Sequence, residues 1–339
     1  MNLRGSNNGH TTYRDALRQA LSDGMAEDPD VVLIGEEVGR YGGAYGVTKG
    51  LIDKFGHERV IDTPISEPSI VGAAVGAAMS GLRPVVELMY VDFIGMTMDQ
   101  LANQAAKIRY MFGGQIGVPM ILRTQGGTGR SAGAQHSQSL EAYIMHTPGL
   151  RLAMPATVSD AYHLLRWSLT QPDPVVFIEH KALYATSGEL DIRQATAPWG
   201  KAHVVNHVGN NVVNQGDDLV IVTYSRQLHY ALAAAETLAR DGINATIIDL
   251  RTLNPLDIDT IRLHVEKCGR AMVVSEGVMT AGVAAELAAR ISEECFDFLE
   301  EPVIRIAGED IPISVSPLLE INSAPTPELI VDAAKMMLS

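Results

Sequence analysis

Short apolar runs alternate with amphipathic segments along the first half of the chain. The apolar runs cover residues 30–35, 83–90, 118–123 and 174–180, and the segments between them include residues 12–21, 70–82, 99–110 and 155–169. The first of these segments opens with a capping box, Thr12 to Asp15, after which apolar residues recur at helical spacing. Fully apolar strands that alternate with helices are typical of a parallel sheet covered on both faces.

The alternation stops after His180 and resumes near residue 219. The polar stretch between them contains proline and glycine, which predicts a linker with one or two short hairpins. Beyond it, apolar runs at residues 219–224, 245–250, 271–275 and 303–306 alternate with helical segments at residues 229–240, 257–266, 283–295 and 327–338. We therefore predict an α/β fold of two doubly wound domains at residues 11–185 and 216–339, joined by a linker over residues 186–215 and preceded by a flexible N-terminus over residues 1–10.

The composition indicates a folded protein, and its charge argues against nucleic acid and membranes as partners. Of the 339 residues, 46% are hydrophobic and 19% are charged, and the formal net charge is −14. An acidic surface repels phosphate backbones and anionic lipid, so we expect neither nucleic-acid binding nor membrane binding. Only two cysteines, Cys268 and Cys295, are present, and the polar N-terminus resembles neither a signal peptide nor an amphipathic presequence. We therefore expect a cytoplasmic protein of a bacterium or archaeon, or an organelle protein already trimmed of its presequence.

Glu67 is the first candidate for chemistry, because it stands in the turn Pro64-Ile-Ser-Glu-Pro68 directly before a helix of small residues. Proline is well tolerated in the first turn of a helix, and Ser66 or Glu67 can cap the free N–H groups there. A negative charge is also favoured at that end of the helix dipole. The local sequence alone therefore favours a helix cap over a catalytic carboxylate.

The helix after Glu67 carries Gly72, Gly76 and Ser80 at intervals of four residues. Small residues on one face of a helix allow another backbone to approach closely. The stripe suits tight packing within the domain and a helix pair across a subunit interface equally well.

Histidines occur in two segments that invite a functional interpretation. The glycine-rich residues 123–138 include His136 but have neither the spacing of a P-loop nor the pattern of a dinucleotide-binding turn. A mobile active-site loop that presents His136 as a proton donor is chemically plausible, although a lone histidine is more often structural. His203 and His207 stand four residues apart in a valine-rich stretch without a third ligand, so we do not expect a metal site there.

Nine short motifs occur in an order that resembles one protein family. They are Gly35-Glu-Glu-Val38, Tyr41-Gly-Gly-Ala-Tyr45, Thr63-Pro-Ile-Ser-Glu67, Gly81-Leu-Arg-Pro84, Asp99-Gln-Leu101, Ala134-Gln-His-Ser-Gln138, His146-Thr-Pro-Gly-Leu150, Asp249-Leu-Arg-Thr-Leu-Asn-Pro-Leu256 and Gly269-Arg270. From residue 11 to its C-terminus the chain resembles the beta subunit of the thiamine-diphosphate-dependent decarboxylase component of 2-oxo acid dehydrogenase complexes. The resemblance implies a transketolase-like pyrimidine-binding domain followed by a domain of the transketolase C-terminal type.

The resemblance also implies roles for individual residues. Glu67 would hydrogen-bond the pyrimidine ring of thiamine and so activate the cofactor for attack on the carbonyl carbon of the substrate. Phe93 would stack on that ring, and Met89 and Met96 would line the same pocket.

Further roles follow from the same resemblance. His136 would lie near the substrate and the lipoyl group during acyl transfer, and Glu36 would take part in communication between paired active sites. A potassium ion, held largely by backbone carbonyls as suits a hard cation, would fall on Met120, Ser168, Leu169, Gln171 and Asp173. Gln171 stands there in place of an expected aspartate.

One half of the expected active site is missing from the sequence. Thiamine enzymes hold the diphosphate through magnesium, which a Gly-Asp-Gly motif and a later Asn bind, and the nearest string, Gly216-Asp-Asp218, has no matching Asn. The resemblance implies that a separate alpha subunit supplies the diphosphate and magnesium site, in a heterotetramer with thiamine diphosphate at its alpha–beta interfaces. The second domain would serve dimer contacts and docking to the lipoyl acyltransferase core.

The leading hypothesis is therefore a beta subunit that helps to cleave a 2-oxo acid or acetoin and acylates a lipoyl domain. Residues 89–93 and 123–131 resemble pyruvate-type and acetoin-type members most. Half of a split transketolase is the alternative, because it would also use Glu67 but would not acylate a lipoyl domain. A scaffold without activity is a third hypothesis, which the joint presence of Glu67, Phe93 and His136 disfavours.

Overall fold

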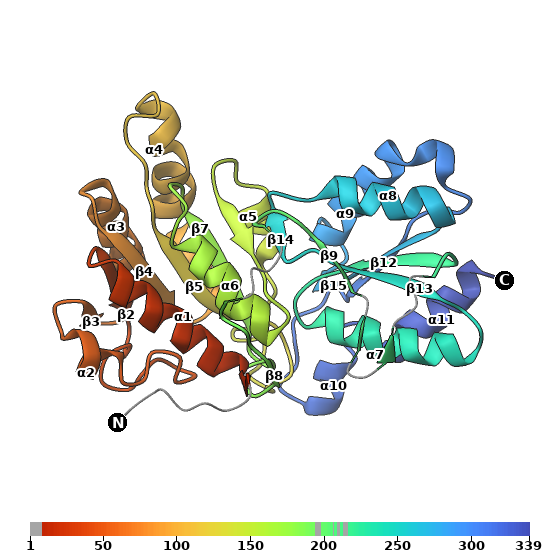
Figure 1. The fold of residues 1–339 in the computed structure, drawn as a ribbon, viewed down its shortest axis with the longest axis horizontal. Helices are drawn as coiled ribbons and strands as arrows, with labels where there is room; N and C mark the ends of the chain where they lie inside the picture. Colours follow the sequence, from red (N-terminus) through yellow and green to blue (C-terminus); the bar gives the residue numbers. More distant parts are fainter. Residues whose placement is uncertain (1–8, 194–197, 206, 209–210, 213–215) are drawn as a thin grey trace. The chain divides into compact units, whose positions relative to one another are not determined.

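The computed structural model describes residues 9–193, 198–205, 207–208, 211–212 and 216–339 (Figure 1). The flexible N-terminus predicted for residues 1–10 lies almost wholly outside the described residues, as does part of the predicted linker. Two compact units make up the chain: the part up to Gln125 together with His146–Trp199, and Gly126–Met145 together with Gly200–Ser339. In the described part of the chain, no helix is both long and apolar enough to cross a bilayer.

The first unit is built on a parallel sheet with the strand order β6-β7-β5-β4-β2-β3. Its strands are β2 (Val31–Gly35), β3 (Val60–Asp62), β4 (Arg83–Leu88), β5 (Ile121–Gly126), β6 (Arg151–Ala153) and β7 (Val175–His180). A separate antiparallel pair joins β1 (His10–Thr12) to β8 (Ser187–Glu189). The strands β2, β5 and β7 are buried along their whole length. β2 is accordingly an unbroken apolar run, whereas β5 and β7 begin with apolar residues and also bury polar ones.

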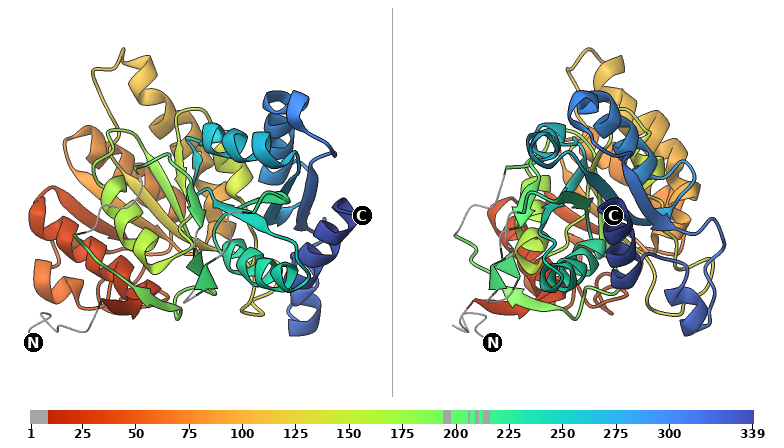
Figure 2. Two further views of the ribbon diagram at one scale, coloured as in Figure 1. Left: turned by 45° about the vertical axis from the view of Figure 1, so that its right-hand side comes forward. Right: turned by 90° about the vertical axis from the view of Figure 1, so that its right-hand side faces the viewer.

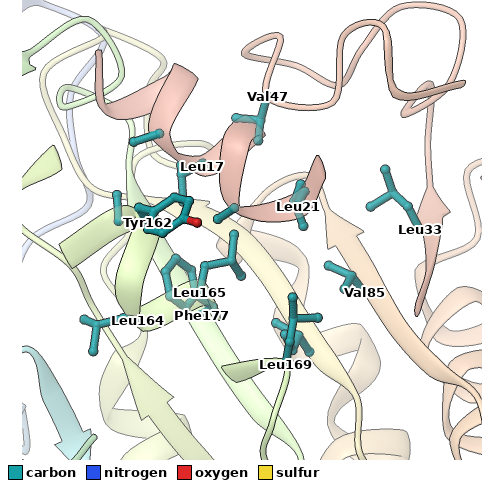
Figure 3. Packing of buried hydrophobic residues seen from close by; sticks show 14 of the residues in the cluster. Leu17, Leu21, Leu33, Val47, Val85, Tyr162, Leu164, Leu165, Leu169 and Phe177 are labelled. Atoms are coloured by element: carbon teal, nitrogen blue, oxygen red, sulfur yellow. The ribbon is translucent and has the colours of Figure 1, made fainter. Parts of the chain in front are cut away.

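Helices cover both faces of this sheet. They are α1 (Tyr13–Glu27), α2 (Leu51–Phe55), α3 (Glu67–Met79), the 3-10 helix η1 (Val91–Thr97), the π-helical η2 (Asp99–Ala105), α4 (Ala106–Met111) and α6 (Val158–Ser168). α1 and α6 pack against each other over one face, where Leu17, Leu165 and Phe177 form part of the core (Figure 3). α3 packs on β4 and on η1 and η2.

A buried ion cluster ties three neighbouring strands of the first unit together. Arg123 on β5 donates to both carboxylate oxygens of Glu179 on β7, at 2.7 and 2.9 Å, and to Glu87 on β4 at 2.9 Å. The Tyr184 hydroxyl also donates to Glu179, at 2.5 Å. All of these side chains are nearly or fully inaccessible to water. Satisfied charges of this kind fix strand register, because any slip would leave a buried charge without its partner.

The second unit has a five-stranded sheet with the order β16-β15-β12-β13-β9, in which only β9 runs antiparallel to its neighbour. α7 and α11 lie side by side against it, and α8 and α9 form a second packed pair (Figures 1 and 2). The strands of this sheet are β9 (His203–Val205), β12 (Leu219–Thr223), β13 (Ala245–Asp249), β15 (Ala271–Val278) and β16 (Ile304–Gly308). Outside it lie the pair β10 (His207–Val208) and β11 (Asn211–Val212) and the short strand β14 (Thr252–Asn254). The helices are α5 (Glu141–Met145), α7 (Gln227–Arg240), α8 (Ile258–Cys268), α9 (Val283–Glu294), η3 (Phe296–Phe298), α10 (Pro317–Ile321) and α11 (Pro327–Met337).

The predicted α/β class of two successive units is confirmed, and the capping box at Thr12 is present as expected, with the Asp15 amide donating to its hydroxyl at 3.1 Å. The predicted hairpin in the linker is the pair β10–β11. Short elements such as β3, β6 and α10 have too few residues to show a period, so the sequence pattern missed them. The sequence also gave no sign that Gly126–Met145 belongs to the second unit, because that assignment depends on contacts made far along the chain.

We predict that Arg123→Leu destabilises the protein by about 3–5 kcal/mol, because it leaves the Glu87 and Glu179 carboxylates buried without their cation. Urea unfolding measures the loss. Arg193→Leu is the matched control, because the Arg193 side chain is 89% exposed, and no measurable change is expected there. Equal stability of the two variants would contradict a structural role for the cluster.

Candidate active site

The fold brings three of the predicted site residues to one edge of the first unit's sheet. The strands β3, β2 and β4 are parallel neighbours, so their carboxyl ends meet there (Figure 1). Glu36 directly follows β2, Met89 directly follows β4, and Glu67 follows β3 after a four-residue turn. The negative charge of Glu67 raises the pKa of the Glu36 carboxyl, so the two carboxylates lie within reach of each other's charge.

Glu67 is largely buried as a residue, and its carboxylate has no structural partner among the described residues. Glu67 opens α3 and is 6% exposed. The preceding Ser66 occupies the N-cap position, but its hydroxyl makes no capping hydrogen bond. Within the described residues, no group donates a hydrogen bond to the Glu67 carboxylate either. Neither side chain therefore serves as a cap. The oxygens of this carboxylate are not among the fully buried atoms that lack a partner, so a ligand can reach them and complete the site.

Glu36 is a second carboxylate with an unsatisfied oxygen. It is 9% exposed, and its Oε1 atom is buried without a hydrogen-bond partner among the described residues. Burial raises the pKa of the Glu36 carboxyl, and the negative charges of Glu67 and Glu37 raise it further. Two neighbouring carboxylates, one of which takes up a proton more readily than usual, are typical of acid–base sites.

The η1 helix provides the apolar side of the site. Phe93 lies in its first turn and is partly buried, as is Met89 just before it. η1 packs on α3, the helix that Glu67 opens. Met96 also lies on η1, but it is 55% exposed. The aromatic ring is thus part of the same substructure as the two carboxylates, whereas Met96 faces outward in the single chain.

A buried ion pair that the sequence analysis missed holds η1 in place. The Lys181 ammonium lies 3.5 Å from Oδ2 of Asp92, and both side chains are 1% exposed. It also lies 4.5 Å from the centre of the Tyr90 ring. Lys181 directly follows β7, and Asp92 directly precedes Phe93. In the sequence, this ion pair is indicated only by a lysine at the end of a buried strand. That position does not reveal which acidic residue the lysine pairs with.

These residues fit a cofactor that carries a heteroaromatic ring with a basic nitrogen. The Glu67 carboxyl group can share a proton with such a nitrogen, which would give the carboxylate a hydrogen-bond partner. An aromatic side chain such as Phe93 offers a face for stacking, and the Met89 thioether is an adaptable contact for a ring.

His136 lies on the second unit and the other site residues on the first. It follows a turn in which its backbone N–H donates to the Gly133 carbonyl at 3.2 Å. The loop expected at this position is present, since the Gly127 N–H donates to the Gln138 carbonyl at 3.0 Å and closes it at its base.

The residues proposed for potassium do not fit a cation. The set comprises Met120, Ser168, Leu169, Gln171 and Asp173. Its single carboxylate, that of Asp173, already accepts hydrogen bonds from two guanidinium groups, those of Arg109 and Arg151. A third guanidinium, that of Arg83, donates to the Leu169 carbonyl at 3.2 Å. Positive charge already occupies the place where the ion would bind, so we derive no role for potassium.

The segments of the second unit at which we expected no metal site take part in its secondary structure and local hydrogen bonds. Oδ2 of Asp218 accepts the Asn244 N–H at 2.7 Å, and the Gly216 carbonyl accepts the Thr246 hydroxyl at 2.9 Å. His203 belongs to β9, and the side chain of His207 lies outside the described residues. No group of three His, Cys, Asp or Glu side chains in the described part of the chain is placed to hold a metal ion.

Only part of the small-residue stripe of α3, formed by Gly72, Gly76 and Ser80, packs against other residues of the first unit. A methyl group at Gly72 would meet Gln100 at 3.5 Å, but one at Gly76 would meet nothing within 4 Å. Gly76 and Ser80 are both exposed. The interface interpretation of this stripe stays a prediction.

Comparison with known proteins decides the family. A model of the transketolase pyrimidine-binding domain matches residues 10–186, and a model of the transketolase C-terminal domain matches residues 210–330. The pyruvate dehydrogenase E1 component subunit beta-2, mitochondrial, of Oryza sativa subsp. japonica is 44% identical over 96% of this chain and 85% of that protein. The chain belongs to the E1 beta-subunit family.

This E1 beta-family chain is also similar to a second curated protein and, in its fold, to a solved structure. The acetoin:2,6-dichlorophenolindophenol oxidoreductase subunit beta of Cupriavidus necator is 42% identical over 94% of this chain and 95% of that protein. A solved structure titled split gene transketolase, inactive beta4 tetramer, superposes with a TM-score of 0.78 over 96% of this chain and 97% of that one. Its sequence identity is 19%, so that likeness concerns the fold alone.

We predict that Glu36→Gln raises the melting temperature of the cofactor-free protein by a few degrees at about pH 7.5. A carboxyl whose pKa is raised in the folded state destabilises that state once pH exceeds the unfolded value, whereas glutamine stays neutral. The gain should therefore shrink as pH falls towards about 4.3, the usual glutamate pKa. Glu58→Gln at an exposed position is the control. A pH-independent difference between Glu36→Gln and the native protein would contradict the raised pKa.

Proposed function

We propose that the chain is the beta half of a two-subunit, thiamine-diphosphate-dependent enzyme that cleaves a carbon–carbon bond in pyruvate or acetoin and acylates a lipoyl group. E1 beta relatives named for pyruvate and for acetoin support this reaction class. The observation that carries the proposal is Glu67, a largely buried residue at the start of α3 whose carboxylate stays accessible and has no hydrogen-bond donor among the described residues. A ring nitrogen of the cofactor would supply the missing partner.

Each residue of the first unit has a separate task in this proposal. When bound, thiamine diphosphate supplies the carbon that attacks the substrate carbonyl and takes up the electrons of the cleaved bond. Glu67 shares a proton with the pyrimidine ring nitrogen, and Phe93 stacks on that ring. Met89 and Met96 exclude water from its edges.

Two further residues handle protons in the proposed reaction. The pKa of the Glu36 carboxyl is raised by burial and by the negative charge of Glu67, so Glu36 takes up a proton more readily than an ordinary carboxyl. This supports a role in proton exchange with the Glu67 site and so in communication between paired active sites. His136 donates a proton as the acyl group moves to the lipoyl group.

An alpha subunit completes the site in this proposal by holding magnesium and the diphosphate. The relatives' name, E1 component subunit beta, implies such a companion. The open space at Gly76 and the exposure of Met96 support a surface that a second chain covers. We propose a heterotetramer whose beta subunits also dock to a lipoyl acyltransferase core through the second unit.

We propose a cytoplasmic location as well. Cys268 and Cys295 are buried free thiols, as suits a reducing compartment. The plant relatives are named mitochondrial, and the proposed cytoplasmic location does not extend to them.

Half of a split transketolase is the weaker candidate. It shares the fold at 19% identity, whereas the beta subunits for pyruvate and acetoin share 42–44%. The complex of this chain with its alpha subunit, assayed with pyruvate, acetoin and branched-chain 2-oxo acids, separates the two. Acylation of a lipoyl domain supports our proposal, and transfer of ketol units between sugars without acylation overturns it.

We predict that Glu67→Gln lowers the activity of the complex by about 10²–10⁴-fold, the usual contribution of a proton-transferring group. Dye reduction with pyruvate or acetoin measures the loss. Ser66→Ala is the matched control, because the Ser66 hydroxyl makes no capping bond, and it should retain activity. Full activity of Glu67→Gln would refute the assignment.

We also predict that the isolated chain binds thiamine diphosphate weakly, since it supplies only the pyrimidine half of the site. Isothermal titration with and without the alpha subunit measures the difference. Tight, magnesium-dependent binding by the isolated chain would contradict the shared site.

A further inference from the structure

The loop that carries His136 is held by carboxylates of the second unit. Gly126, Gly127, Gly129 and Gly133 give this segment many backbone conformations in the unfolded chain, so a single folded conformation carries a large entropy cost. Specific contacts must offset that cost. The closing hydrogen bond from Gly127 to Gln138 fixes only the base of the loop.

Glu320 on α10 gathers the backbone N–H groups of the first half of the loop. One carboxylate oxygen accepts from the Gly129 N–H at 2.8 Å and the Arg130 N–H at 3.3 Å. The other accepts from the Ser131 N–H at 2.9 Å and the Ser131 hydroxyl at 3.3 Å. Glu320 is 3% exposed, so these charge-assisted bonds are shielded from water.

The backbone of the loop is bent to make these bonds. Gly129 has a φ of 95° and Ser131 a φ of 52°. A side chain such as that of Ser131 rarely adopts a positive φ, and the strain persists only where the surroundings fix it. Successive N–H groups in such a turn converge into a concave anion site. Here the anion is a side chain of the same protein.

A second carboxylate extends the contact by one residue. Oε1 of Glu276 accepts from both the N–H and the hydroxyl of Thr128, at 2.6 and 2.8 Å. On the far side of His136, the Tyr224 hydroxyl donates to the buried Glu141 at 2.8 Å. The loop is therefore fixed before and after the histidine by side chains of its own unit.

We propose that Glu320, assisted by Glu276, is a positioning residue that holds the loop in the conformation in which His136 serves acyl transfer to the lipoyl group. The part played by His136 rests on the proposed function. Glu320 itself touches neither substrate nor cofactor in this proposal. Its effect is confined to the step that needs the histidine, and the step that depends on Glu67 does not require it.

Glu320→Gln tests the contact in the full chain. Glutamine has the same shape, but its amide NH₂ must face either the N–H groups of Gly129 and Arg130 or that of Ser131. Loss of charge-assisted bonds should speed hydrogen exchange of a peptide covering residues 128–132 by about tenfold or more. Glu301→Gln, at an exposed position of the same unit, should leave this exchange unchanged. Unchanged exchange in Glu320→Gln would overturn the proposal.

Activity of the complex with its alpha subunit shows whether the contact acts through His136. We expect Glu320→Gln to lower lipoyl-domain acylation by about tenfold, while dye reduction stays within about twofold of the native rate. In a His136→Gln background, Glu320→Gln should have no further effect on acylation, because coupled residues are not additive. An equal loss of both activities, or an undiminished effect in the double variant, would contradict the proposal.

Two further outcomes distinguish a failure of the Glu320 proposal from a failure of the proposed function. If Glu320→Gln does not fold, Ser131→Ala removes only the hydroxyl bond, and it should speed exchange of the same peptide by a smaller factor. If the native complex does not acylate a lipoyl domain at all, the proposed function fails, and so does the role given to His136. Faster exchange in Glu320→Gln would then still establish that Glu320 holds the loop.

Discussion

The ion cluster around Arg123 is the interaction on which the first unit depends. Arg123 and Glu87 are register partners on β5 and β4, and Glu179 reaches the same guanidinium from β7. The carboxyl ends of these strands lead directly to Met89, to the glycine-rich loop and to Lys181. A register slip in any strand would break a buried charge pair and move one of these segments. The ion cluster inside the sheet therefore determines where the strands end, and so where the site residues that follow them lie.

The cluster also reaches the segment that follows Glu36. Gly43 has a φ of 75°, and a methyl group there would lie 2.6 Å from the Glu87 carboxylate. Only glycine allows the backbone to pass so close to the buried charge. Strand register and the path of the loop after Glu36 are therefore linked through direct packing.

The sequence predicted the long elements well because they have a clear period. The apolar strands β2 and β7 and the helix α1 are where the pattern placed them. The alignment of motifs indicated Glu67 and Phe93, but it could not show that Ser66 leaves its capping position unused. Only the structure shows this, because a Ser-Glu pair at the start of a helix can either form capping hydrogen bonds to backbone N–H groups or leave them unmade.

Contacts between distant parts of the chain were beyond prediction for a different reason. The Lys181–Asp92 pair joins residues that no local pattern relates. The same holds for Glu320, which lies 191 residues from Gly129 in sequence. A period reveals which face of an element is buried, but it does not identify the partner.

The separation between Glu320 and its loop has a consequence for recombination between relatives. A chimera that exchanges residues 126–145 alone would combine the N–H donors of one parent with the acidic side chains of another. Fragments chosen by sequence continuity would cut this unit in two. The segments that must be exchanged together are therefore not continuous in sequence. The loop, the end of the strand at Glu276 and the short helix at Glu320 need to come from the same parent.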